Sequence, residues 1–80
     1  MSLRPETRRV LEAYLADRAE KGNFQAALAY DEKTGYVTIH GRSVAGGTER
    51  NFDSSTLFEG PQSIRAVRSA IDRVAGQLST

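Results

Sequence analysis

The spacing of the hydrophobic residues predicts a helix near each end of the chain. Over residues 5–21 hydrophobic side chains recur three or four positions apart, which places them on one face of an α-helix. A proline in the first turn and Gly22 just after the segment are typical of a helix start and end. The same spacing returns over residues 64–78, with charged and polar residues on the other side. The two hydrophobic faces consist of Val10, Leu11, Tyr14 and Leu15 and of Ile64, Val67, Ile71, Val74 and Leu78.

Between these segments the hydrophobic period shortens to two, which is typical of strands. Residues 24–30 alternate between larger apolar side chains and smaller or polar ones. Residues 31–35 predict a turn that ends with a left-handed glycine, so a returning strand should cover residues 36–42. The glycine pair after Ala45 predicts a second reversal, followed by a third strand over residues 48–53. Residues 56–59 have the spacing of a capping box and predict a short separate turn before the second helix.

This order of elements predicts the fold class. A helix, a three-stranded antiparallel meander and a helix, with both helices packed on one face of the sheet, make an α+β domain. Residues 1–80 should form this single domain, since the chain shows no repeat or linker composition. A core in a chain of this length contributes only a few kcal/mol. We therefore expect a homodimer, which would bury further apolar surface or pair the free edges of the sheet.

Composition narrows the classes of function. The chain has no cysteine and one histidine, which excludes disulfides and the usual zinc sites, so we expect neither a metal nor another cofactor. No apolar run reaches the length of a signal peptide or a membrane span, and we expect a soluble cytoplasmic protein without membrane contact. A net charge of +1 lacks the basic excess that marks many nucleic-acid binders.

The polar stretch over residues 37–56 is the first candidate for a functional surface. If the larger apolar residues of the strands face the helices, the opposite face of the sheet is free. It can be the ordinary solvated face of an antiparallel sheet, or a binding surface on which small residues leave the backbone accessible. The residues expected on it are Ala27, Ala29, Tyr36, Thr38, His40 and Arg42, together with some of Glu49, Arg50, Asn51 and Asp53.

Catalytic chemistry has little support in the sequence, and we do not expect an enzyme. His40 could act as a general base, but the nearest nucleophile and carboxylate in sequence, Ser43 and Asp53, form no recognisable motif. The glycine pair at residues 46–47 lacks the ending of a phosphate loop and precedes a strand. Asp31 and Glu32 lack the further ligand spacing of a calcium loop.

A nucleic-acid module is the alternative interpretation. The order helix, three strands, helix is that of double-stranded RNA-binding domains, which read the shape of RNA through phosphates and 2′-hydroxyls. In that family a cluster of lysines opens the second helix, whereas here the corresponding segment offers Arg65, with Arg68 and Arg73 further along. Arg68 and Asp72 have the spacing of an ion pair within the helix. Direct nucleic-acid binding is therefore not our first expectation, and a self-associating structural domain is a further alternative.

Two short segments, Gly41-Arg42-Ser43-Val44 and Arg50-Asn51-Phe52-Asp53-Ser54, carry a resemblance to a known family. They resemble segments of phage-encoded anti-CRISPR proteins that block the type I-F surveillance complex, and the turn over residues 29–35 is loosely similar as well. The similarity covers the middle third of the chain. This chain departs from the family by placing a helix before the sheet and by lacking the family's acidic sheet residue near Tyr36.

The resemblance implies a non-enzymatic inhibitor, acting in the host cytoplasm, that docks its sheet on the protein backbone of an RNA-guided complex. It also implies that Tyr30 contacts the partner. With the residues of the free sheet face, it predicts a binding protein whose partner is a protein or a ribonucleoprotein. The candidate contact residues are Tyr30, Tyr36, His40, Arg42, Glu49 and Arg50.

Overall fold

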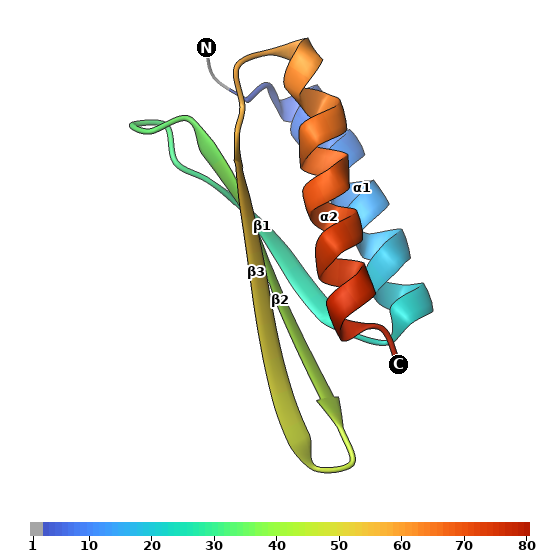
Figure 1. Ribbon diagram of the computed structural model, residues 1–80. Coiled ribbons are helices and arrows are strands. Elements are labelled where there is room, and N and C mark those ends of the chain that lie inside the picture. Colours follow the sequence, from blue (N-terminus) through green and yellow to red (C-terminus); the bar gives the residue numbers. More distant parts are fainter. Residues whose placement is uncertain (1–2) are drawn as a thin grey trace.

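The architecture is one antiparallel sheet with two helices on the same face. The computed structural model describes residues 3–80, and its strands are arranged in the order β1-β2-β3. Both helices lie side by side against one face of this sheet, so the predicted α+β class with the order αβββα is confirmed (Figure 1). The elements are α1 (Pro5–Gly22), β1 (Gln25–Tyr30), β2 (Tyr36–Ala45), β3 (Thr48–Leu57), the short 3-10 helix η1 (Pro61–Ser63) and α2 (Ile64–Leu78).

Strands β2 and β3 are longer than the sequence pattern predicted. A two-residue turn joins them, in which Gly46 and Gly47 have φ values of 59° and 79°. Two left-handed residues match the twist of the flanking strands, so the pairing continues without a break from the turn to the far end of the strands. Thr56 and Leu57 are the last residues of β3, and the separate turn predicted at residues 56–59 is therefore wrong. The long β2 strand supplies the partner that extends β3.

The end of α1 also differs from the prediction. Gly22 is the last helical residue, and the left-handed position is occupied by Asn23, with φ of 58°. A side chain at Gly22 would lie 2.7 Å from the ring of Phe24 and would also meet Ser79. The absence of a side chain at position 22 is thus required by close packing between the end of α1 and the end of α2. Residues far apart in the sequence create this packing.

The core lies between the helices and the covered face of the sheet. Its fully buried side chains include Leu11 of α1, Val37 and Ile39 of β2, and Ile71 of α2. The last turn of α2 rests on Gly41, where an added Cβ atom would lie 2.5 Å from side-chain atoms of both Val74 and Leu78. Of the helices in residues 3–80, none combines the length and the apolar character that crossing a bilayer requires.

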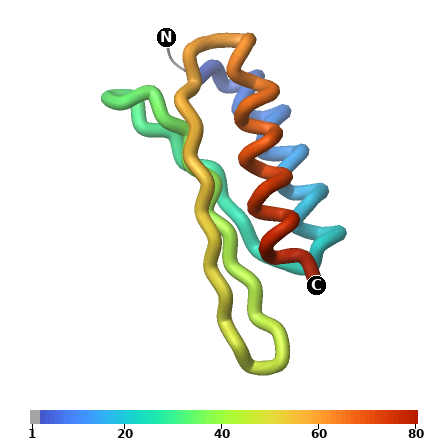
Figure 2. Tube along the Cα trace, in the orientation of Figure 1, coloured from blue at the N-terminus to red at the C-terminus, as the bar shows by residue number. Residues whose placement is uncertain are grey.

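Beyond Gly41 the sheet continues without helices. Strand β1 begins at Gln25, opposite Arg42, whereas β2 and β3 remain paired as far as Ala45 and Thr48. Residues 43–50 therefore form a two-stranded hairpin, and beyond the buried Ser43 it projects past the ends of both helices (Figures 1 and 2). We call this segment the overhang. It accounts for much of the elongated shape, with principal extents of 42 × 21 × 16 Å.

Candidate functional site

The sheet face opposite the helices is uncovered along its whole length. Side chains alternate between the two faces of a strand, and on β2 the buried positions Val37, Ile39, Gly41 and Ser43 alternate with more exposed ones. We call the uncovered surface the open face. Its side chains come from Gln25, Ala27 and Ala29 of β1, from Tyr36, Thr38, His40, Arg42 and Val44 of β2, and from Glu49, Asn51, Asp53, Ser55 and Leu57 of β3.

Four of the six candidate contact residues lie on the open face: His40, Arg42 and Glu49 towards the overhang, and Tyr36 at the opposite end of the strands. The other two do not. Tyr30 is paired with Val37 and packs against the core on the covered face. Arg50 pairs with the buried Ser43, so its side chain is on the covered side, within the overhang. Because side chains alternate between the two faces of a strand, Tyr30 and Arg50 lie on the face opposite to the other four candidates.

Polar side chains in the middle of the open face are paired with each other. His40 lies opposite Asp53, and its Nδ1 is 3.2 Å from the carboxylate Oδ2. Thr38 lies opposite Ser55, and their hydroxyl oxygens are 2.8 Å apart. Such directly opposed residues are the closest neighbours across an antiparallel pair. The register of β2 and β3 thus produces a row of satisfied polar groups.

A second polar cluster surrounds Glu49 at the base of the overhang. Nε and Nη2 of Arg42 each lie 2.9 Å from Oε1 of Glu49, and the amide of Asn51 donates to Oε2 at 3.2 Å. The hydrogen bond from Asn51 and the charge of Arg42 lower the pKa of Glu49 from its usual value of 4.5. The carboxylate therefore stays ionised and bonded to two neighbours at neutral pH.

This cluster gives a pH-dependent prediction. Because the folded pKa of Glu49 is below its usual value of 4.5, the stabilisation by its partners is present above that value and is lost as pH falls through the folded pKa. The parent should melt slightly above a Glu49→Gln variant at pH 7, since exposed pairs contribute little, and this difference should vanish once the pH lies well below the folded pKa. Thermal melts of both proteins from neutral to acidic pH measure it. A difference that grows towards low pH would contradict the assignment.

Apolar and small side chains occupy other parts of the open face. Tyr36 and Leu57 are cross-strand partners at the end away from the overhang, and they are 46% and 38% exposed. Along β1 the small side chain of Ala27 leaves a shallow hollow of about 460 Å³, bordered by His40 and Asp53. The face thus offers an exposed aromatic–aliphatic pair, a hollow and a polar row.

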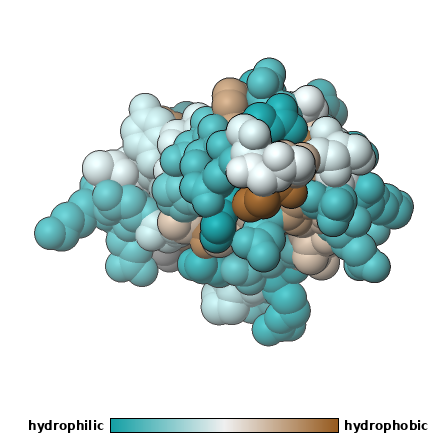
Figure 3. All heavy atoms as spheres, turned by 90° about the horizontal axis from the view of Figure 1, so that it is seen from below, coloured by the Kyte–Doolittle hydropathy of each residue, from teal (hydrophilic) through white to brown (hydrophobic). Residues whose placement is uncertain are grey.

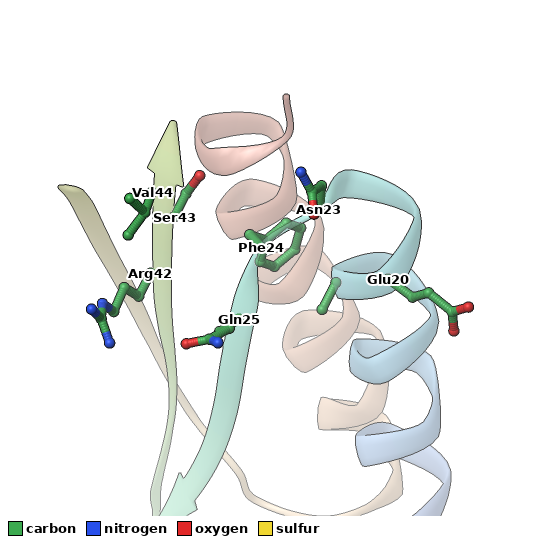
Figure 4. Close-up of a pocket in the computed structure, with 8 residues that line it drawn as sticks. Glu20, Asn23, Phe24, Gln25, Arg42, Ser43 and Val44 are labelled. Carbon is green, nitrogen blue, oxygen red and sulfur yellow. The ribbon is translucent and has the colours of Figure 1, made fainter. Parts of the chain in front are cut away.

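The end of the molecule that carries the overhang is mainly hydrophilic, with only small hydrophobic areas (Figure 3). Beside the overhang, a second hollow of about 430 Å³ lies between the last turn of α1 and the part of β2 that β1 does not reach. Arg42 and Val44 point to one side of β2 there, and Ser43 to the other (Figure 4). The hydroxyl of Ser43 is buried and has no hydrogen-bond partner among residues 3–80.

The geometry brings only part of a catalytic arrangement together. Asp53 is placed to orient His40, but Ser43 is 2% exposed and lies on the opposite face of β2. A hydroxyl on the other side of the strand cannot be activated by this histidine. Over residues 3–80, no group of three or more His, Asp or Glu side chains could hold a metal ion.

Two arginines on the helices, Arg18 and Arg68, contact neighbouring side chains. The predicted ion pair of Arg68 with Asp72 within α2 is not formed. Arg68 instead lies over the ring of Tyr14, 4.7 Å from its centroid. Asp72 accepts a hydrogen bond from the hydroxyl of Tyr14 at 2.7 Å and pairs with Arg18 at 3.1 Å. The pKa of Arg18 is raised. The hydrogen bond with Tyr14 is the largest cause, and the electrostatic effects of Tyr14 and Asp72 come next.

The sequence analysis did not identify Leu57, Val44 and Ser55 as part of the open face. The prediction ended β2 and β3 too early, so these positions were assigned to no strand. The signal that could have found them is the glycine pair at 46–47, because a two-residue turn fixes the register of the whole hairpin. Counting outwards from that turn pairs His40 with Asp53 and Tyr36 with Leu57.

Comparison of the chain with known proteins gave no relative. No protein-family model matches it, and no match was found among curated proteins or among solved structures. Its function is therefore argued from the residues and their arrangement.

Proposed function

We propose that the chain is a non-catalytic binding protein that docks its open face on a protein partner. The observation that carries this proposal is the exposed pair of Tyr36 and Leu57, on a sheet face that no helix covers. An aromatic ring held on a strand is a rigid anchor, and such residues are enriched among those that dominate binding energy. The alanines of β1 leave room beside the strands for side chains of the partner.

The charges of the open face suit a protein surface better than a phosphate backbone. His40 faces Asp53 and Arg42 faces Glu49, so each basic group has an acidic neighbour. When a partner covers such pairs, each charge keeps its neighbour. A buried charge without a partner, which is costly when an interface forms, is thus avoided. A nucleic-acid surface would instead present several free cations to successive phosphates.

The resemblance to anti-CRISPR proteins suggests which partner to test. The two segments that carry it, residues 41–44 and 50–54, are paired with each other in the β2–β3 hairpin. They include Arg42, Asn51 and Asp53 of the open face. We therefore propose the protein subunits of a type I-F surveillance complex as the first partner, with inhibition of target recognition as the consequence.

A binding experiment with two matched charge variants tests this proposal. The purified type I-F complex is titrated onto the immobilised parent, a Tyr36→Glu variant and an Arg65→Glu variant, in which the change lies on the exposed side of α2. We expect the parent to bind, Tyr36→Glu to weaken binding at least about tenfold through loss of a buried anchor, and Arg65→Glu to bind like the parent. Thermal melts confirm that both variants are folded.

The other outcomes each contradict a named part of the proposal. No binding of the parent rejects the type I-F complex as partner, and equal binding by Tyr36→Glu rejects the open face as the interface. A gel-shift titration with an arbitrary RNA duplex completes the test. Tight binding that falls steeply with added salt, the signature of phosphate contacts, would favour the nucleic-acid module in place of the protein-binding function.

A further inference from the structure

The two outer edges of the sheet differ in how they are protected. On β1, Nη2 of Arg8, which α1 carries to this side, donates a hydrogen bond to the main-chain carbonyl of Leu28 at 3.1 Å. On β3 the pairing with β2 is regular over the whole of Thr48–Leu57, and this strand contains neither proline nor lysine. Bulges, prolines and charged side chains, lysine above all, are the usual means of blocking a free edge. Of these, β3 carries only the charged Glu49, Arg50 and Asp53, so its main-chain groups are open to a further strand.

The residues of β3 whose main chain points outwards can be identified. The N–H of Phe58 donates to the carbonyl of Gly35 just before β2, at 2.8 Å, so even-numbered residues of β3 bond to β2. The alternate residues of β3 direct their N–H and C=O groups to the free edge. On β1 the alternation starts from the hydrogen bond of the Asp31 N–H to the carbonyl of Tyr36. It directs the carbonyl of Leu28 outwards, where Arg8 contacts it. The outward residues of β3 are Glu49, Asn51, Asp53, Ser55 and Leu57.

We propose that a second copy of the chain pairs with this edge, β3 against β3 in antiparallel orientation, about a two-fold axis at Phe52. In this register Asn51 faces Asp53 of the partner and Glu49 faces Ser55 of the partner, so about eight main-chain hydrogen bonds join outward residues on both sides. The half-buried Phe52 meets its own copy at a non-hydrogen-bonded pair, where side chains approach most closely. Together the two copies would form one six-stranded sheet with a continuous open face, twice the three strands of each protomer.

Electrostatics disfavours the neighbouring registers. An axis at Asp53 would place that carboxylate opposite its own copy, and an axis at Asn51 would place Glu49 opposite Asp53 of the partner. Like charges directly opposed across a strand pair are destabilising. An axis at Arg50 brings the two copies of this arginine together.

The position of α2 selects the same register. Its last turn rests on Gly41, which is opposite Phe52, and from there the helix runs beside the part of β3 that ends at Leu57. In an antiparallel pair about Phe52, the partner segment next to residues 53–57 is residues 47–51, and all of these except Asn51 belong to the overhang. Each α2 then lies next to the bare overhang of the other copy. An axis moved to Ser54 would bring the two α2 helices against each other.

One contact in this arrangement is unfavourable and makes the register testable. Arg50 would face Ser54 of the partner, whose hydroxyl already accepts a hydrogen bond from Nη2 of Arg73 at 3.0 Å. Two guanidinium groups would then be neighbours, which weakens the dimer. A glutamate at position 50 would instead pair with Arg73 of the partner. Arg50→Glu should therefore strengthen association, an effect that neither monomeric protein nor pairing through β1 produces.

Sedimentation velocity at protein concentrations up to about 100 μM tests the dimer without any other partner. Interfaces of modest size reach dissociation constants in the micromolar range, which these concentrations cover. The parent of 8.8 kDa should shift to twice that mass. Asn51→Pro, which removes an outward N–H and no bond to β2, should remain monomeric and folded. Ala26→Pro removes an outward N–H from the β1 edge and should still dimerise. A monomeric parent throughout this range, or a dimer that survives Asn51→Pro, would overturn the proposal.

Disulfide trapping tests the register itself, in a chain that has no cysteine of its own. A Glu49→Cys/Ser55→Cys variant should form a covalent dimer under mild oxidation, because the two positions face each other between copies and are too far apart along one strand to bond within a chain. Arg50→Glu should lower the dissociation constant at least about threefold, the effect of one exposed ion pair replacing a repulsion. Absence of the covalent dimer, or weaker association of Arg50→Glu, would rule out the axis at Phe52.

Discussion

Replacing Ile71 by aspartate is expected to abolish the folded state at room temperature. Ile71 is fully buried at the centre of the hydrophobic face of α2 and belongs to the single core that both helices and the sheet share. The change removes a large apolar side chain and places a carboxylate where no partner for it exists. Burying an unpaired charge and losing core volume each cost several kcal/mol. Their sum reaches the roughly 5 kcal/mol that a small domain has in total.

Thermal and urea unfolding followed by circular dichroism measure this effect. The Ile71→Asp variant should show no cooperative transition. Arg65→Asp is the matched control, since it places the same side chain on the exposed side of the same helix, near its N-terminus, where an acidic group is favourable. It should melt close to the parent. A cooperative transition of Ile71→Asp near that of the parent would mean that α2 does not pack on the sheet through this residue.

A valine at Gly41 is expected to destabilise the protein by about 3 kcal/mol through overpacking. The added Cβ atom would lie 2.5 Å from Val74 and Leu78 and 3.0 Å from the main-chain oxygen of Phe52. The end of the Leu78 side chain can move, but the branched Val74 is stiff and fully buried, and the oxygen belongs to the main chain of the neighbouring strand. Both helix packing and strand pairing therefore oppose the substitution.

Gly76→Ala is the matched control for this glycine. Gly76 lies in α2, the helix that packs on Gly41, and has open space around it, so an alanine there should raise stability by about 0.5–1 kcal/mol, the difference in helix propensity. Urea unfolding of the three proteins gives both values. Equal stability of Gly41→Val and the parent would show that the last turn of α2 does not rest on the sheet at this point.

The types and order of the elements follow from the residue pattern along the chain. Three-to-four spacing in the helices and alternation in the strands place residues such as Ile71 and Val37 in the core, because these periods follow from backbone geometry alone. The glycines at 35, 46 and 47 fix both turns, since all three adopt positive φ. The assignment of Tyr36, His40 and Arg42 to one face was predictable for the same reason.

The ends of the strands and the pairs of side chains that meet depend on contacts between distant parts of the chain. Val44 and Leu57 extend the sheet because each strand supplies the partner of the other, which no local pattern reveals. Asp72 bonds to Tyr14 and Arg18 of α1 rather than to Arg68 four residues away, because the packing of the two helices brings these donors of α1 within reach. The unequal protection of the two sheet edges likewise depends on where α1 places Arg8 and on where α2 ends over the sheet. Contacts between segments far apart in the chain set the positions of both helices.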